Sequence, residues 1–394
     1  MPASDQPDPN HPPRPSAIPP ELQTLRDRID QIDHRFLELL EERHRIVGEV
    51  AAVKRTSGVP IKDPGRESAL IADRRDRAGR SGLSPEVVES LFRLVLWASR
   101  NQQARLHAAV PIDMEPRRVA VIGALGGMGS MFAGLLTDLG HEVLAVDRDT
   151  ALSVEDAAAS ADVTLVCVDI RETEGVIRRA GPHVPEAGLI TDVTSTKRGP
   201  VAAMLASSSA SVIGMHPLFG PRVHSLQGQR IALTPARLHE GTDWMSWLQA
   251  TLDSAGLTIL ETTAEDHDRV MAVVQVLTHY STEVVGRTMR SLGVSIEETL
   301  RFTSPIYHLE LLMTARHFAQ SPDLYSAIQM SNPNTEEVTS AFLKSAEELD
   351  ALIRTGDAQA FEHAFSEVTD FFGDFASRAL SESTHLIDRL VERS

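Results

Sequence analysis

The stretch RVAVIGALGGMG, residues 118–129, decides the fold of the middle of this chain. Its apolar half is typical of a short buried strand, and its glycines form a tight turn directly before a helical pattern. Asp147 ends the next apolar run, 18 residues after Gly129. Glycines at such a turn let the backbone approach a pyrophosphate at the helix N-terminus, and the carboxylate accepts hydrogen bonds from a ribose diol. The pattern predicts a dinucleotide-binding unit.

The expected cofactor contacts are Gly123, Gly126, Gly127, Met128, Gly129 and Asp147. When the fingerprint is aligned on Gly126 and Gly129, Ala124 stands at its first glycine, so the local turn should differ from the usual one. Asp147 would repel a 2′-phosphate, which favours NAD over NADP. The adjoining Arg148 leaves NADP open as the alternative.

Short apolar runs alternate with helical patterns around this stretch, and the alternation predicts a mainly parallel, doubly wound sheet. The runs lie at residues 119–122, 143–146, 163–168, 189–193, 212–215 and 231–233. Two polar clusters, DVTSTK at 192–197 and GMHPLFGP at 214–221, follow the fourth and fifth runs. Ligands bind at such strand ends in open α/β folds.

His216, in the second cluster, is the predicted catalytic residue. A histidine can accept a proton from a hydroxyl while hydride leaves the same carbon, and a nearby serine such as Ser195 can hold its ring orientation. Lys197 is one of only four lysines in the chain, which favours a place in the site over a solvated helix start.

Both flanks of this unit are predicted to be helical. Apolar residues at steps of three and four from Leu22 to Val53 predict one amphipathic helix of about 34 residues. Such a length exceeds the usual range, so this helix should pack against a partner helix or a second subunit. Shorter helices are expected at 64–77 and 86–106, and a long one at 267–292.

The chain is therefore expected to be multidomain, with two all-α parts around an α/β part. The predicted division is a disordered, proline-rich tail at 1–20, a helical domain at 21–106, a linker at 107–116, a Rossmann-type domain at 117–263 and a helical domain at 264–394.

Composition narrows the class of protein. The chain has 38 Lys+Arg and 55 Asp+Glu, and the net charge of −17 argues against nucleic-acid binding. Residues 21–106 carry 16 basic and 14 acidic residues, whereas 107–394 carry 21 and 39, which suggests that the first module handles an anion. Solvated helix faces are the alternative. Without a long apolar run, a signal-peptide pattern or metal-ligand spacing, we expect a cytoplasmic protein with no membrane span and no metal.

The first helical segment resembles the all-helical class of chorismate mutase. The resemblance lies in Leu25-Arg26, Glu42-Arg43, Lys54, Pro60-Ile61-Lys62-Asp63, Arg66-Glu67, Ser99 and Gln103. Arg43 and Lys54 are 11 residues apart, which places both on one side of the helix, about 20° apart, while Arg26 lies about 100° away. In this family an intertwined dimer carries two sites, and the arginine matching Arg26 completes the other subunit's site. The resemblance thus implies a homodimer.

The same resemblance implies roles for these residues in the rearrangement of chorismate to prephenate. Arg26, Arg43 and Arg66 would hold carboxylates, and Lys54 and Gln103 would donate to the ether oxygen. Asp63, Glu67 and Ser99 would place the hydroxyl and neighbouring groups. The reaction is unimolecular, so this site needs no nucleophile or cofactor.

The remainder is similar to prephenate dehydrogenase, in the fusion order of the bifunctional enzymes of tyrosine biosynthesis. The segments that carry the similarity are GALGGMG, DVTSTK, GMHPLFGP, Glu265-Asp266-His267-Asp268, Ser304-Pro305-Ile306-Tyr307 and MTARHFAQ at 313–320. His308 departs from the pattern, since some relatives carry arginine there.

This second resemblance implies NAD-dependent oxidative decarboxylation of prephenate to 4-hydroxyphenylpyruvate. His216 would hydrogen-bond or deprotonate the ring hydroxyl, Ser195 would orient it, and Arg316 would hold the ring carboxylate. Lys197, Gln275, His279 and Tyr325 would lie around the substrate or inhibitor. The C-terminal helices would form a dimer, and L-tyrosine would be the feedback inhibitor.

Two alternatives stay open. The dehydrogenase could prefer arogenate, and the N-terminal helices could be a regulatory module without catalysis. The many polar residues retained in that module argue against the second alternative, because a structural hairpin has no need to bury them. A 3-hydroxyacid dehydrogenase would leave the N-terminal module unexplained.

Overall fold

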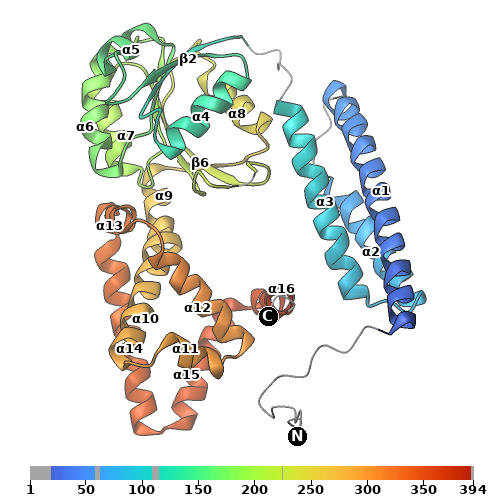
Figure 1. Ribbon diagram of the computed structural model, residues 1–394. Coiled ribbons are helices and arrows are strands. Elements are labelled where there is room, and N and C mark those ends of the chain that lie inside the picture. Colours follow the sequence, from blue (N-terminus) through green and yellow to red (C-terminus); the bar gives the residue numbers. More distant parts are fainter. Residues whose placement is uncertain (1–18, 58–62, 109–114, 224, 392–394) are drawn as a thin grey trace, which may run out of the picture. The chain divides into compact units, whose positions relative to one another are not determined.

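The computed structural model describes residues 19–57, 63–108, 115–223 and 225–391 (Figure 1). They form two compact units, one on each side of residues 109–114. Most of the expected tail, the 58–62 part of the mutase-like motif and the middle of the expected linker lie outside the described residues. No described helix is long and apolar enough to cross a membrane.

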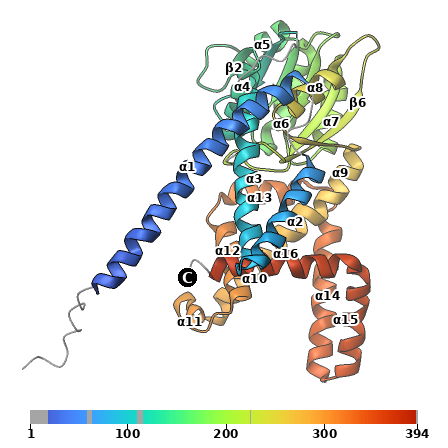
Figure 2. The ribbon, with the colours of Figure 1, turned by 90° about the vertical axis from the view of Figure 1, so that its right-hand side faces the viewer.

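The first unit consists of three helices, and the single long helix predicted from Leu22 is confirmed. The helices are α1 (Pro20–Thr56), α2 (Pro64–Arg80) and α3 (Pro85–Ala108). The Asp63 side chain caps α2 by accepting the backbone N–H of Arg66 at 2.9 Å. Helix α3 packs on both α1 and α2, and Figure 2 shows the first half of α1 extending beyond them.

The second unit begins with a seven-stranded sheet in the order β2-β1-β3-β4-β5-β6-β7. The strands are β1 (Arg118–Ile122), β2 (Glu142–Val146), β3 (Val163–Val166), β4 (Leu189–Asp192), β5 (Ser211–Pro217), β6 (Arg230–Arg237) and β7 (Thr258–Glu261). Strands β1 to β5 run parallel, and β6 pairs antiparallel with β5. All six predicted strands are present. Strand β7 was not predicted, because its sequence TILE has only two apolar residues.

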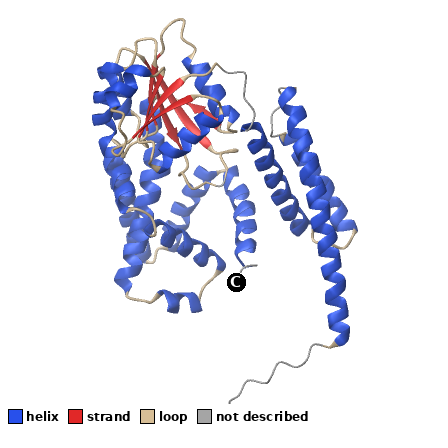
Figure 3. Cartoon of the chain, turned by 45° about the horizontal axis from the view of Figure 1, so that its top comes forward, coloured by secondary structure: helices blue, strands red, loops and turns tan. Residues whose placement is uncertain are grey.

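Helices cover both faces of the sheet, as a doubly wound fold requires (Figure 3). They are α4 (Gly127–Asp138), α5 (Val154–Ser160), α6 (Ile170–Ala180), the short η1 (Gly181–His183), α7 (Arg198–Ser207) and α8 (Trp244–Ser254). Successive β1 residues point to opposite faces: Val119 and Val121 join the core under α4 and α8, while Ala120 and Ile122 join the core under α5, α6 and α7.

The helices after the sheet begin with a continuous helical path over residues 264–292. It comprises α9 (Ala264–Met271), a π-helical turn η2 (Ala272–Leu277) and α10 (Thr278–Leu292). The remaining helices are α11 (Ile296–Arg301), α12 (Pro305–Phe318), α13 (Pro322–Ser331), α14 (Thr335–Thr355), α15 (Ala358–Phe372) and α16 (Asp374–Val391). The long helix predicted at 267–292 is thus present, with a π turn inside it.

Candidate active sites

A cavity of about 640 Å³ opens where β1, β2 and β3 end, and Gly123, Gly126 and Asp147 line it. Gly123 has φ +88°, and a Cβ there would lie 2.5 Å from the carbonyl oxygen of Cys167. Positive φ is confined to glycines among the described residues, so the left-handed turn falls on Gly123 and Ala124 needs no special conformation. This shift by one residue explains the departure at Ala124.

Helix α4 begins beside this cavity. A Cβ on Gly129 would lie 1.9 Å from the carbonyl oxygen of Gly123, so only glycine lets α4 approach β1 so closely. A Cβ on Gly127 would lie 2.7 Å from Cγ of Pro221. Gly127, Met128 and Gly129 form the first turn of α4 and are not among the described residues that line the cavity.

Asp147 is anchored at the end of β2. Its Oδ2 accepts the backbone N–H of Leu125 at 2.9 Å, and its Oδ1 accepts that of Arg148 at 2.8 Å. The Arg148 guanidinium donates to both carboxylate oxygens of Glu172, at 2.6 and 2.8 Å. Four carboxylates line the cavity, those of Asp147, Asp149, Asp169 and Glu172. Its two arginines, Arg148 and Arg179, are already paired with Glu172 and Glu155, an arrangement that suits a ribose diol better than a 2′-phosphate.

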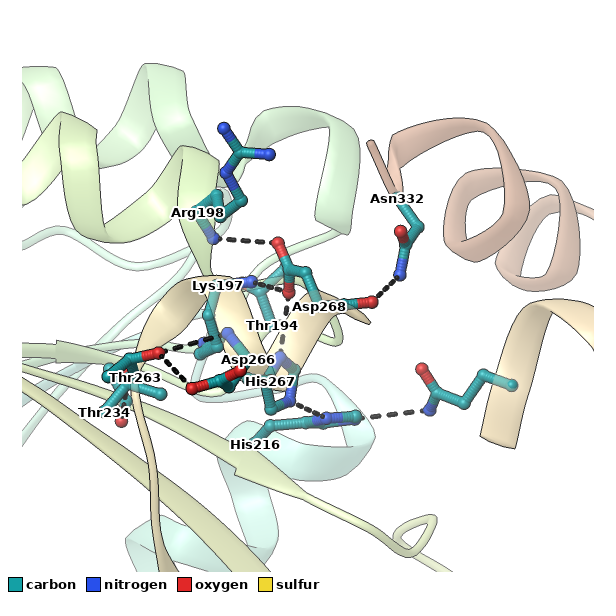
Figure 4. A network of polar contacts seen from close by, with 12 residues as sticks. Thr194, Lys197, Arg198, His216, Thr234, Thr263, Asp266, His267, Asp268 and Asn332 are labelled. Carbon is teal, nitrogen blue, oxygen red and sulfur yellow. Dashed lines mark hydrogen bonds and ion pairs between the residues drawn. The ribbon is translucent and has the colours of Figure 1, made fainter. Parts of the chain in front are cut away.

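His216 lies at the end of β5 in a buried polar network (Figure 4). It is 2% exposed, and its Nδ1 lies 2.9 Å from Nε2 of His267 on α9. His267 Nδ1 lies 2.8 Å from Oδ1 of Asp268. On the other side of the ring, His216 Nε2 lies 3.4 Å from the amide nitrogen of Gln275. Burial, followed by the charges of His267 and Lys197, holds the pKa of His216 well below its usual range.

Lys197 is fully buried, so it is neither a solvated helix start nor exposed to a ligand. Its ammonium donates to Oδ2 of Asp192 and to the backbone oxygen of Met215, both at 2.5 Å. Met215 directly precedes His216, so this buried ion pair fixes the strand end that carries the histidine. Lys197 therefore supports the strand end instead of making the substrate contact that was expected of it.

Ser195 does not contact the histidine as expected. Within the described residues no hydrogen bond joins it to His216, and the ring is held by His267 and Gln275 instead. Gln275 lies on the π turn η2, a type of irregularity common at functional sites.

The other predicted substrate residues gather beyond Gln275. The Tyr325 ring meets His279 edge-on at 4.7 Å and stacks on His317 at 4.0 Å. His279 Nδ1 is buried and has no hydrogen-bond partner among the described residues. Burial raises the pKa of Tyr325, and the charge of the exposed Arg316 opposes that rise. Of these residues, Gln275 adjoins His216, His279 and Tyr325 contact each other, and Arg316 lies close to Tyr325.

A second cavity, of about 490 Å³, lies among α1, α2 and α3 in the first unit. Seven predicted mutase residues line it, namely Arg43, Lys54, Asp63, Arg66, Glu67, Ser99 and Gln103. The Arg43 guanidinium donates to the Ser99 hydroxyl. Gln103 is buried, and its Oε1 has no partner within the described part of the chain. Arg26 is absent from the lining, in agreement with the rotation that separates it from Arg43.

Known protein families match three parts of the chain: the N-terminal helices, the domain with the sheet and the C-terminal helices. Residues 25–104 match the family described as chorismate mutase type II, residues 133–261 the prephenate dehydrogenase nucleotide-binding domain, and residues 263–367 the prephenate dehydrogenase dimerization domain. The chain is 35% identical over 370 residues to the T-protein of Enterobacter agglomerans, covering 93% of this chain and 97% of that protein. The chain belongs to the T-protein family.

Other comparisons agree with this membership. The T-protein of Haemophilus influenzae is 32% identical over 371 residues, with the same shares of both chains covered. A crystal structure of prephenate dehydrogenase from Aquifex aeolicus, in complex with hydroxyphenyl propionate and NAD+, shares the fold. Its TM-score is 0.53 at 20% identity, covering 66% of this chain and 99% of that one. The prediction of a bifunctional chorismate mutase and prephenate dehydrogenase of tyrosine biosynthesis is confirmed.

Three residues stand in the sites without a role assigned from the sequence. His267 and Asp268 were part of a recognised segment, but nothing in their spacing from His216 indicates contact. Arg100 lines the mutase cavity and donates to Oε2 of Glu67 at 2.8 Å. Arg100 directly follows Ser99 on α3, and that adjacency to a predicted site residue is the signal that could have found it.

Proposed function

We propose that both sites are catalytic and that His216 is the base of the dehydrogenase reaction. The observation that carries this proposal is the arrangement of the His216 ring. Its Nδ1 is occupied by His267, and its Nε2 faces only the weakly held amide of Gln275, so Nε2 is the nitrogen that a substrate hydroxyl can reach. Because burial lowers the pKa of His216, the ring is neutral near pH 7 and able to accept a proton.

NAD fits the cavity at the ends of β1 and β2, where Gly123 and Gly126 leave room for the pyrophosphate and Asp147 accepts from the ribose. When bound, NAD supplies the acceptor for the hydride that leaves the hydroxyl-bearing ring carbon. His216 takes the hydroxyl proton at Nε2. Arg316 holds a substrate carboxylate, and His279 and Tyr325 enclose the rest of the substrate or the inhibitor tyrosine.

In the mutase cavity, Arg43 and Arg66 hold the two carboxylates of chorismate, and Lys54 and Gln103 donate to the ether oxygen as it gains negative charge. The support is that these side chains line one cavity. The Gln103 amide nitrogen, which is the donor, makes only a long hydrogen bond of 3.4 Å to the backbone oxygen of Ser99. Arg100 pairs with Glu67 and thereby holds that carboxylate ready to accept from the substrate hydroxyl.

The assembly is proposed to be a homodimer. Apolar side chains along α1, including Leu25, Ile29 and Ile32, are more than half exposed in a single chain, and residues 263–367 match a dimerization domain. The domain bounds 21–106, 117–263 and 264–394, a cytoplasmic location and inhibition by tyrosine also stay proposals.

The purified protein should reduce NAD when given chorismate alone, because the first site then supplies prephenate to the second. The measurement is absorbance of reduced nicotinamide, with prephenate and arogenate in parallel reactions. Signal from prephenate but not chorismate would show that the first unit is not catalytic. Reduction of NAD with arogenate but not with prephenate would show that arogenate is the substrate.

His216→Asn should lower kcat for prephenate oxidation about 10²- to 10⁴-fold, the usual contribution of a positioned base, with NAD affinity unchanged. NAD binding is measured by fluorescence titration, and mutase activity of the same sample confirms a folded chain. Retention of full turnover would remove His216 from the role of base.

A further inference from the structure

Asp268, His267 and His216 form one buried chain of hydrogen bonds that ends at the reactive nitrogen (Figure 4). Asp268 is fully buried, and His267 and His216 are 3% and 2% exposed. The Asp268 carboxylate also accepts the backbone N–H of Lys197 at 2.7 Å and that of Arg198 at 3.0 Å. The Asp268 carboxylate is thus the acceptor at the end of the chain, and two backbone N–H groups hold it in place.

The hydrogen bonds fix the position of each proton along this chain. Asp268 accepts from both backbone N–H groups, so His267 donates to it from Nδ1. The lone pair of His267 then lies at Nε2, and His216 donates its Nδ1–H to it. This leaves the lone pair of His216 at Nε2, on the side of Gln275. The network therefore selects the tautomer that a base needs, and Ser195 is not required for it.

We propose that His267 and Asp268 are positioning and proton-storing residues, which form with His216 a relay for the substrate hydroxyl proton. The inference rests on the proposed role of His216 as base. As the carbon gives up its hydride, the hydroxyl proton bonds to His216 Nε2. The proton on His216 Nδ1 moves to His267 Nε2, and the resulting imidazolium is paired with the Asp268 carboxylate.

The proton balance of the reaction fits a relay that stores a proton and returns it. Oxidation of the ring carbinol to a ketone releases one hydride and one proton. Loss of CO₂ then sends the bonding electron pair into the ring and makes a phenolate, which needs one proton to become the phenol of the product. The buried relay can return the stored proton to the phenolate through His216 Nε2. This step needs no exchange with solvent and no other co-reactant.

The charged groups that face His216 come from three elements. His267 and Asp268 lie on α9, Lys197 precedes α7, and Asp192 ends β4. Lys197 and Asp192 neutralise each other at 2.5 Å, so Asp268 supplies the charge that stabilises a proton on the two histidines.

The test is the pH profile of kcat/KM for prephenate in His267→Leu and His267→Gln. The base must be neutral, so wild-type activity falls as pH drops through the pKa of His216, which burial holds well below its usual range. His267→Leu removes the proton store and with it the charge that lowers the pKa of His216. Its acid limb should therefore move to higher pH, and kcat should fall about 10²-fold or more with KM and NAD affinity little changed. His267→Gln keeps a hydrogen-bond acceptor for His216 Nδ1 but cannot store a proton, so its acid limb should move in the same direction while kcat remains low.

Asn332→Ala is the matched control, because Asn332 donates to the backbone oxygen of Asp268 and takes no part in the relay. It should leave the acid limb unchanged. Mutase activity in each sample reports that the chain is folded. An acid limb that does not move in His267→Leu, whatever happens to kcat, would overturn the relay. Full activity in His216→Asn would instead overturn the base on which the relay depends, so the two failures are distinguishable.

Discussion

At the scale of single residues, the pairing of Arg148 affects the choice between NAD and NADP. Its guanidinium lies beside Asp147 in the nucleotide cavity and is held by both oxygens of Glu172. A 2′-phosphate would have to displace Glu172 and approach two carboxylates. The paired arginine therefore does not give the cavity the character of an NADP site.

Glu172→Gln should free Arg148 and lower the KM for NADP about two- to fivefold, a small effect because an exposed ion pair contributes little. NAD should remain preferred because Asp147 is unchanged. Initial rates with both cofactors measure the ratio of kcat/KM values, and the thermal midpoint checks that folding is unaffected. An unaltered ratio would mean that Asp147 alone sets the preference.

At the same scale, sequence reasoning identified the residues with chemistry but not all their partners. His216 could be predicted because a strand end beside Gly214 and Pro217 is a ligand site in any such sheet. His216 ends strand β5, whereas His267 lies 51 residues away on helix α9, and only the packing of α9 on the sheet brings the rings together. For Lys197 the sequence suggested a role in the site because lysine is rare in this chain. The structure buries it with Asp192, where it holds the strand end that carries His216.

At the scale of elements, the contact of α4 with β1 depends on Gly129. The Cβ of an alanine there would lie 1.9 Å from the Gly123 carbonyl oxygen and 3.0 Å from Cα of Ala124, both backbone atoms that cannot rotate away. Gly134→Ala in the same helix is the matched control, because its Cβ would meet no atom within 4 Å among the described residues.

Gly129→Ala should push α4 away from the sheet, lower the thermal midpoint of the second unit and weaken NAD binding at least tenfold. Gly134→Ala should leave NAD affinity unchanged and stabilise the helix by about 0.5–1 kcal/mol. Calorimetry and NAD titration measure both effects. Equal NAD affinities in the two variants would mean that the close approach is not needed for the cofactor.

The elements that were missed share a physical cause. Strand β7 has two apolar residues, and it is a strand because β6 pairs beside it with the register Ile231 to Ile259. The π turn of η2 is invisible to a helical period, since one extra residue in a turn leaves a long apolar pattern almost unchanged. Long amphipathic helices were predictable because many residues repeat the same signal, whereas these short features depend on neighbours.

At the scale of the whole molecule, the proposed mutase site lacks Arg26 within one chain. Arg26 is 17 residues before Arg43 on α1, roughly 25 Å along the helix axis, so it cannot reach the cavity of its own chain. The apolar face of the first half of α1 is exposed in a single chain. A second copy of the chain would bury this face and would also supply Arg26. Arg26 then acts only in the partner's site.

Arg26→Ala and Arg43→Ala should each abolish most mutase activity as separate homodimers, because each removes a carboxylate partner from both sites. In a mixed dimer, one site combines the intact Arg43 of one chain with the intact Arg26 of the other, while the second site lacks both. Co-expression of equal amounts should therefore restore about a quarter of wild-type mutase activity, since half of the dimers are mixed and half of their sites are intact. Dehydrogenase activity, which needs neither arginine, normalises the samples. Mixed dimers isolated by two affinity tags that show no recovery would place Arg26 outside the partner's site.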